Sequence, residues 1–256
     1  MSARGAFMSL ASLLITGLLI AGCGTHRDGA AAITAPGAIL AASKSSATLP
    51  TFDPGTFVSS VTNPYFPLVP GTTFTYIAHT SAGTESTVTA VTHDTKTILG
   101  VTTTVVHDRV FLNGTLAEDT FDWYAQDAAG NVWYFGEDTK EFEAGGIVST
   151  EGSWESGVNG ALPGVIMLAS PQVGDTYPQE QATGLAEDMA RVTSLDASVT
   201  VPYGTFDPVL QTLEWSNLEH GHGSRETKSY ASGVGLVLES ARNGKERTEL
   251  VSITHE

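Results

Sequence analysis

Three aspartates in a run of predicted β-strands are the first residues whose spacing suggests chemistry. Asn113-Gly114 is the preferred two-residue hairpin turn, because both central positions need a positive φ. Pairing counted back from that turn places Asp108 opposite Asp119. A second turn at 127–130 places Asp138 opposite Asp119 as well. The register therefore predicts one row of three carboxylates across three adjacent strands.

The same register puts this row on the apolar face of the sheet, with Val106 and Val110, while Arg109 and Glu118 pair on the wet face. Like charges opposite each other destabilise a sheet, and buried carboxylates need compensation. A divalent cation such as Ca²⁺ would supply it. Alternatively, one carboxyl stays protonated, with a raised pKa suited to acid–base catalysis. In a third alternative, a β-bulge shifts the register by one residue and turns some of the carboxylates to solvent.

Aromatic residues are dense around this row. Six lie between Phe121 and Phe135, and they alternate onto both faces of the predicted strands. Core packing explains one set, but both faces of a sheet are seldom core. We therefore expect Phe121, Trp123 and Tyr134, on the side of the aspartates, to line a pocket for an apolar or sugar-like ligand.

Two further groups of polar residues are weaker candidates. His220 and His222 point to one side of an extended chain, as in some metal sites, but they lie in an apparent loop next to Glu219. Glu180 and the pair Glu187-Asp188 fit a site or a charged turn equally well. The sequence has no G-x-S-x-G elbow, P-loop, G-x-G-x-x-G or H-E-x-x-H motif, which disfavours nucleophilic and nucleotide-dependent enzymes.

The elements that would position these residues are almost all strands. Alternating Thr, Val, Tyr, Phe and Trp, interrupted by Gly, Asn, Asp and Pro, favour an all-β fold. We expect either a single antiparallel β-barrel or a strongly curved meander sheet, with a Gly/Pro-rich, lid-like insertion between 143 and 181. A helical turn is indicated only around Leu185–Val192. The predicted strands are 72–80, 84–93, 101–112, 115–126, 131–138, 190–201, 208–216, 226–231, 233–240 and 246–254.

The first fifty residues predict the cellular location of the protein. Residues 1–22 have the charged start and apolar stretch of a signal peptide. They lead into Leu19-Ile20-Ala21-Gly22-Cys23, which resembles a bacterial lipobox. That resemblance implies cleavage before Cys23 and acylation of this cysteine with fatty chains such as palmitate. Residues 23–50 are then a lipidated flexible tether, and 51–256 form one all-β domain. We expect the protein in the bacterial cell envelope, anchored to a lipid bilayer and facing outside the cytoplasm.

Composition excludes other classes. The chain has 28 acidic against 12 basic residues, a net charge of −16, which disfavours nucleic acid as a partner. Its 41% hydrophobic content is enough for a sizeable core. Its single Cys cannot form an internal disulfide.

Several segments resemble a family of bacterial secreted lipoproteins with no established activity. They are Asn63-Pro64-Tyr65-Phe66-Pro67, Asp122-Trp123-Tyr124-Ala125-Gln126-Asp127, Gly130–Glu137 and Gly233-Val234-Gly235-Leu236-Val237. The proline-rich first segment is expected to lie along a sheet edge or to close one end of a barrel.

Together these features predict a lipid-anchored β protein that binds a small ligand or a divalent cation and is not an enzyme. A carboxylate-based hydrolase or isomerase in the same cavity is the alternative. An envelope interaction module without a cavity is the third hypothesis.

Overall fold

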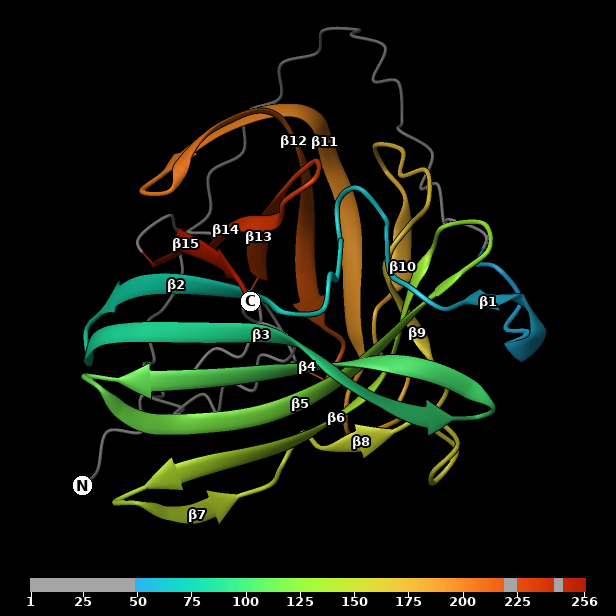
Figure 1. The fold of residues 1–256 in the computed structure, drawn as a ribbon, viewed down its shortest axis with the longest axis horizontal. Coiled ribbons are helices and arrows are strands. Elements are labelled where there is room, and N and C mark those ends of the chain that lie inside the picture. Colours follow the sequence, from blue (N-terminus) through green and yellow to red (C-terminus); the bar gives the residue numbers. More distant parts are fainter. Residues whose placement is uncertain (1–48, 219–224, 242–245) are drawn as a thin grey trace, which may run out of the picture.

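The structure is a computed structural model that describes residues 49–218, 225–241 and 246–256 (Figure 1). Ten long strands form most of it, close to the predicted ranges, because alternation and turn residues are local signals. They are β2 (Thr72–Thr80), β3 (Gly83–Ile98), β4 (Val101–Leu112), β5 (Thr115–Asp127), β6 (Val132–Glu143), β11 (Asp188–Val201), β12 (Gly204–Ser216), β13 (Arg225–Ala231), β14 (Gly235–Ala241) and β15 (Arg247–His255).

Shorter elements connect and flank these strands. They are the 3₁₀ turn η1 (Pro54–Thr56) and strands β1 (Phe57–Val58), β7 (Gly146–Ser149), β8 (Trp154–Glu155), β9 (Gly164–Met167) and β10 (Thr176–Pro178). The helical turn predicted around Leu185–Val192 is absent, since Met189 and Val192 lie in β11. Within the described ranges, no helix is long and apolar enough to cross a membrane.

All strands belong to one antiparallel, strongly curved sheet (Figure 1). Its order is β10-β11-β12-β13-β14-β15-β2-β3-β4-β5-β6-β7. The all-β class and the curved sheet are confirmed, whereas the barrel alternative is wrong. A closed barrel would need β6 and its neighbours to form a continuous ladder with β10. Instead, β6 pairs with the short strands β7, β8 and β9, and the isolated bridge Leu162–Gln181 is the link between the segments that carry β9 and β10. The ring of hydrogen-bonded strands is therefore not closed.

The sheet packs against hydrophobic core on both faces. Neighbouring residues alternate between the two cores: Val106, Tyr124 and Tyr134 face the concave interior, and Val105, Trp123 and Trp133 face the outer core. Phe52 and Phe57, from the segment before β2, cover the outer rings with centroid distances of 5.6–6.0 Å to Trp133 and Phe135. Both sets of rings are therefore packed.

Two β-bulges shift the register that the turns predict. The Asn113-Gly114 turn forms as expected, with φ values of 51° and 81°. Leu112 then pairs with Thr115 and Phe111 with Leu116, but Val110 pairs with Glu118, so Ala117 is an extra residue. Beyond it every partner is displaced by one, and Asp108 pairs with Thr120 instead of Asp119.

The second bulge lies in β6. Tyr124 pairs with Tyr134, but Asp122 pairs with Glu137, so Phe135 and Gly136 together oppose Trp123. Gly136 has a φ of 126°, and a Cβ there would lie 2.2 Å from the carbonyl oxygen of Trp154 in β8. Only glycine fits this position, which lets β8 approach the bulged strand.

Candidate ligand cavity

The concave interior contains a cavity with about 630 Å³ of empty space, including the part that opens to solvent. Most of its wall is apolar, formed by Phe66, Pro67, Leu68, Phe74, Val106, Ile166, Val234 and Leu236. The polar side chains in the wall are Tyr76, Thr89, Asp108, Asp122, Tyr124 and Tyr230. An apolar wall with a few grouped polar side chains is typical of small-molecule sites.

Three segments far apart in the sequence meet at this cavity. Phe66, from the proline-rich segment 63–67, packs edge-on against Tyr124 at 5.2 Å. The amide of Gly233 donates to the Pro64 carbonyl at 2.7 Å and so joins the β13–β14 turn to that segment. These are three of the four segments that carry the resemblance to secreted lipoproteins. The proline-rich segment is thus one wall of the cavity.

Asn63 holds the proline-rich segment in place. Its buried side-chain amide donates to the carbonyls of Gly130 at 2.9 Å and Leu168 at 3.1 Å, and its Oδ1 accepts from the Tyr65 amide at 2.9 Å. Gln126 Oε1 accepts from the Asn63 amide at 2.7 Å. Four hydrogen bonds, two of them buried and two partly buried, therefore fix a segment that has no strand ladder of its own.

Asp108 is the buried carboxyl of the cavity that has an unused acceptor. It is only 3% exposed, and its Oδ1 accepts no hydrogen bond. Burial raises its pKa well above 3.8, with the charges of Asp122 and Glu118 adding to the effect, while the neighbouring Thr89 hydroxyl and the Arg109 amide oppose it. A raised pKa means that Asp108 is neutral over a wider pH range than a surface aspartate.

Asp122 shares a proton network with two neighbours. The Tyr134 hydroxyl oxygen lies 2.7 Å from Oδ1 of Asp122 and 2.9 Å from Oε2 of Glu137. A single phenolic proton serves only one of these acceptors, so the second contact requires a protonated carboxyl that donates to the tyrosine oxygen. Burial raises the pKa of Asp122 to about 7, against the opposing hydrogen bond from Tyr134. Asp122 therefore titrates near neutral pH.

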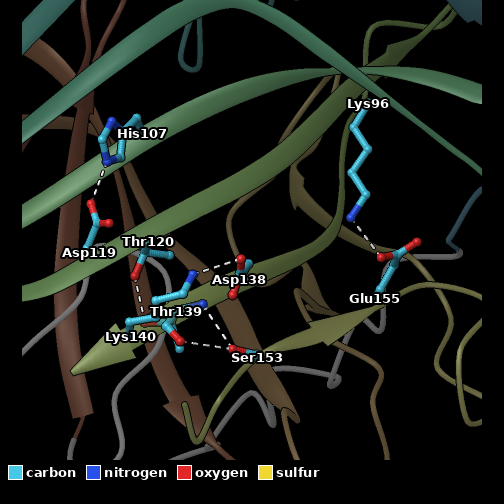
Figure 2. Close-up of polar contacts among 9 residues, drawn as sticks. All are labelled: Lys96, His107, Asp119, Thr120, Asp138, Thr139, Lys140, Ser153 and Glu155. Atoms are coloured by element: carbon cyan, nitrogen blue, oxygen red, sulfur yellow. Dashed lines mark hydrogen bonds and ion pairs between the residues drawn. The ribbon is translucent and has the colours of Figure 1, made fainter. Parts of the chain in front are cut away.

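The predicted row of three aspartates does not exist. The bulge at Ala117 turns Asp119 to the outer face, where it contacts His107 Nε2 at 2.5 Å (Figure 2). Asp138 is also outside, pairs with Phe121 in the ladder and contacts Lys140 Nζ at 2.9 Å. Asp108 alone faces the interior, so these carboxylates cannot share one Ca²⁺ ion. In the described part of the chain, no group of three or more His, Asp or Glu could hold a metal.

The predicted aromatic pocket is also divided between the two faces. Phe121 stacks on His107 on the outer face at 4.1 Å. Trp123 belongs to the outer core, where Lys96 Nζ lies 3.3 Å from its ring centroid. Tyr134 faces the interior but sits behind the cavity wall, stacked on Tyr124 at 4.8 Å. Tyr124, which follows Trp123 in β5, lines the cavity instead.

The remaining candidates do not form a site together. His220, His222 and Glu219 lie outside the described residues. Glu180 is buried, while Glu187 accepts from the Gly184 amide at 2.8 Å in a turn. Glu187 therefore fits the charged-turn interpretation, whereas the buried Glu180 does not.

A buried ion cluster beside the cavity was not predicted. Lys228 Nζ lies 3.0 Å from Glu214, 3.4 Å from Glu226 and 3.8 Å from Glu239. Glu214 pairs with Glu226 and Lys228 with Glu239 across β12, β13 and β14. The three carboxyls exceed the one ammonium, and burial raises the pKa of Glu239 well above 4.5. Only the strand pairing reveals this cluster, since its members come from three strands.

Comparison with known proteins gives limited similarity. No protein-family model matches the chain, and no curated protein sequence matches it significantly. A candidate exported protein with a YmcC-like fold from Bacteroides fragilis is similar over 74% of this chain and 98% of its own, with 12% identity and a TM-score of 0.40. A candidate lipoprotein from Parabacteroides distasonis is similar over 78% and 99%, with the same identity and TM-score. Identity this low leaves the function to be inferred from the residues of this chain.

Proposed function

We propose that this protein binds a small, largely apolar ligand in the cavity of its curved sheet, outside the bacterial cytoplasm. The observation that carries the proposal is the buried Asp108, whose Oδ1 has no hydrogen-bond partner in a mostly apolar wall. Desolvating a carboxyl without a partner costs free energy that the fold alone does not recover. A ligand with a hydrogen-bond donor would recover it.

The support for a ligand rather than a badly packed core comes from the surroundings of the cavity. Side chains that do not line it are packed to full burial, with Tyr134, Val132 and Leu250 at 0% exposure. Protein interiors of this kind leave few voids. One wall of the cavity is a segment that Asn63 anchors with specific hydrogen bonds. These bonds fix the position of the wall, so the cavity does not result from loose packing.

Binding is tested with Nile red, an uncharged dye whose emission shifts in apolar surroundings. We expect saturable binding of one dye per domain, and loss of binding in Leu236→Trp, which fills the cavity from a partly exposed position of the wall. Val148→Trp adds the same ring at an exposed position on β7 and serves as control. Absence of saturable binding, or equal binding by Leu236→Trp, would contradict the proposal.

The anchor is proposed from the sequence, since Cys23 lies outside the described residues. The thiol follows two small residues at the end of an apolar stretch, as cleavage before Cys23 and acylation of this cysteine require. Cys23→Ser is expected to release the protein from the membrane fraction or to stall its processing. If this variant fractionates with membranes as the unaltered chain does, the protein is not anchored through Cys23.

Proton transfer is a second candidate function, favoured by the pKa values of the two cavity aspartates. Asp108 and Asp122 are diagonal neighbours on one face of β4 and β5, with Cα atoms on the order of 7–8 Å apart. The pKa of Asp122 is about 7, so it could act as a base, while burial raises the pKa of Asp108 well above its usual value, as a general acid requires. Exchange of α-hydrogens of cyclohexanone for solvent deuterium, measured by NMR, tests this activity. Exchange that is equal with the Asp122→Asn variant would exclude it.

A further inference from the structure

We propose that the ligand of this cavity carries a protonated amine, held by the carboxylates of Asp108 and Asp122 and by the aromatic rings beside them. The inference rests on the proposed function and specifies the chemical class of the ligand. It is argued from the geometry of the wall, from the imbalance of buried charge and from the competition between an ammonium and a proton.

The unused acceptor selects a donor. Asp108 Oδ1 is buried, lines the cavity and accepts no hydrogen bond, so its partner must donate. An ammonium donates and also carries the charge that an ionised carboxylate attracts, which makes this type of hydrogen bond about twice as strong as a neutral one. An anionic ligand would face two carboxyls in a site of low dielectric constant and is disfavoured.

Buried charge around the cavity lacks a cation. Among the buried side chains of the described residues, Lys228 is the one Lys or Arg, and three glutamates already lie within 3.8 Å of it. The acidic side chains around the cavity therefore outnumber the Lys228 ammonium. The titratable groups concerned are Tyr76 on β2, Asp108 on β4, Glu118, Asp122 and Tyr124 on β5, Tyr134 and Glu137 on β6, Lys228 and Tyr230 on β13 and Glu239 on β14.

The walls suit an amine with an apolar body. Phe66, Phe74, Tyr76, Tyr124 and Tyr230 all line the cavity, next to the two carboxyls. An aromatic face attracts a cation, and the attraction grows when the site excludes water. The remaining wall is aliphatic, so it accepts a hydrocarbon chain or ring. The combination excludes a bare metal ion, which would leave this apolar surface without contacts.

Protons compete with the ammonium for the same oxygens. Burial raises the pKa of Asp108 well above its usual value and that of Asp122 to about 7, so without a ligand protons neutralise these carboxyls at a higher pH than surface aspartates. An ammonium binds best to the ionised form, so its binding releases a proton. Affinity for amines should therefore rise with pH through the pKa of about 7, at most by about tenfold per pH unit.

The experiment compares three homologous series with identical hydrocarbon parts, from butyl to decyl: amines, alcohols and carboxylates. Dissociation constants are measured by calorimetry with the full chain, the Asp108→Asn variant and the Asp138→Asn control, which removes a carboxylate from the outer face. We expect amines to bind about tenfold to a hundredfold more tightly than alcohols, and carboxylates more weakly than both. Asp108→Asn should remove the preference for amines, while Asp138→Asn keeps both this preference and the rise in amine affinity with pH.

Each other outcome overturns a defined part of the argument. Equal binding of amines and alcohols, or a preference for amines that persists in Asp108→Asn, overturns this inference and leaves the proposed function standing. Tighter binding of carboxylates than of amines also overturns this inference and leaves the proposed function standing. Failure of all three series to bind, together with absent Nile red binding, overturns the proposed function itself. The melting temperature of Asp108→Asn shows whether the variant is folded, and Thr89→Val is a second variant that alters the same corner of the wall without removing charge.

Discussion

Replacing Asp122 by asparagine is expected to make the protein more stable at alkaline pH and to flatten the pH dependence of its stability. Asp122 is only 3% exposed, so solvent screens its charge little. Its pKa is about 7 in the folded protein and close to 3.8 in the unfolded chain. Between these values the folded protein binds a proton that the unfolded chain has lost, so stability falls as the pH rises.

The size of the effect follows from the interval between the two pKa values. About three pH units at about 1.36 kcal/mol each give on the order of 4 kcal/mol, present in full below pH 4 and lost once the pH passes 7. For a domain of this size that corresponds to about 10 °C in melting temperature. Asparagine retains the contact with Tyr134, because its amide nitrogen can donate to the phenolic oxygen while Tyr134 donates to Glu137.

The assay is chemical unfolding of the unaltered protein, Asp122→Asn and Asp138→Asn between about pH 4 and pH 8. Only the difference between each variant and the unaltered protein is interpreted, because other buried carboxyls titrate in all three. We expect no difference for Asp122→Asn near pH 4 and a growing gain in stability above it. Asp138→Asn should give a nearly constant difference. If the Asp122→Asn curve runs parallel to that of the unaltered protein, Asp122 is ionised in the folded state and the proton network with Tyr134 is wrong.

Three further predictions concern other parts of the fold. Asn63→Ala leaves two buried carbonyls without donors and should cost about 2–4 kcal/mol in the free energy of unfolding, with a smaller loss for an exposed control such as Asn217→Ala. Lys228→Met removes the cation from three buried glutamates and should destabilise the protein by about 3–5 kcal/mol at pH 8 but less at pH 5, because burial raises the pKa of Glu226 and Glu239 and favours their neutral forms; equal losses at both pH values would contradict the charge cluster. Melting temperatures in chelator, Ca²⁺ and Mg²⁺ should agree, because Asp119 and Asp138 face away from Asp108; a rise with either ion would show a cation site that these contacts do not provide.

The positions of the long strands followed from the sequence alone. The predicted ranges 72–80 and 101–112 coincide with β2 and β4, because alternation of side chains and turn residues depends on near neighbours. The hairpin at Asn113-Gly114 was predicted for the same reason. Placement of Asp108 on the interior face was also correct. Asp108 lies two positions from both Val106 and Val110, and alternate residues of a strand share a face.

The sequence did not determine which residues face Asp108 across the neighbouring strands. One extra residue at Ala117 exchanged the faces of β5, so Asp122 replaced Asp119 in the interior, and a second extra residue at Phe135-Gly136 shifted the register of β6. Nothing in the local alternation marks these bulges. Gly136 is needed there because the carbonyl of Trp154, from a strand formed eighteen residues later in the chain, approaches it at a distance that admits no Cβ.

The cavity itself is a product of tertiary structure. Phe66, Tyr124 and Leu236 come from three segments that meet only when the sheet curves, and their separation along the chain hides the contact. The pKa of Asp122 depends on the same packing, because burial and the charges of other strands raise it. A local pattern can place a side chain on a face of a strand, but the register, the curvature and the desolvation of that face are decided by residues distant in the sequence.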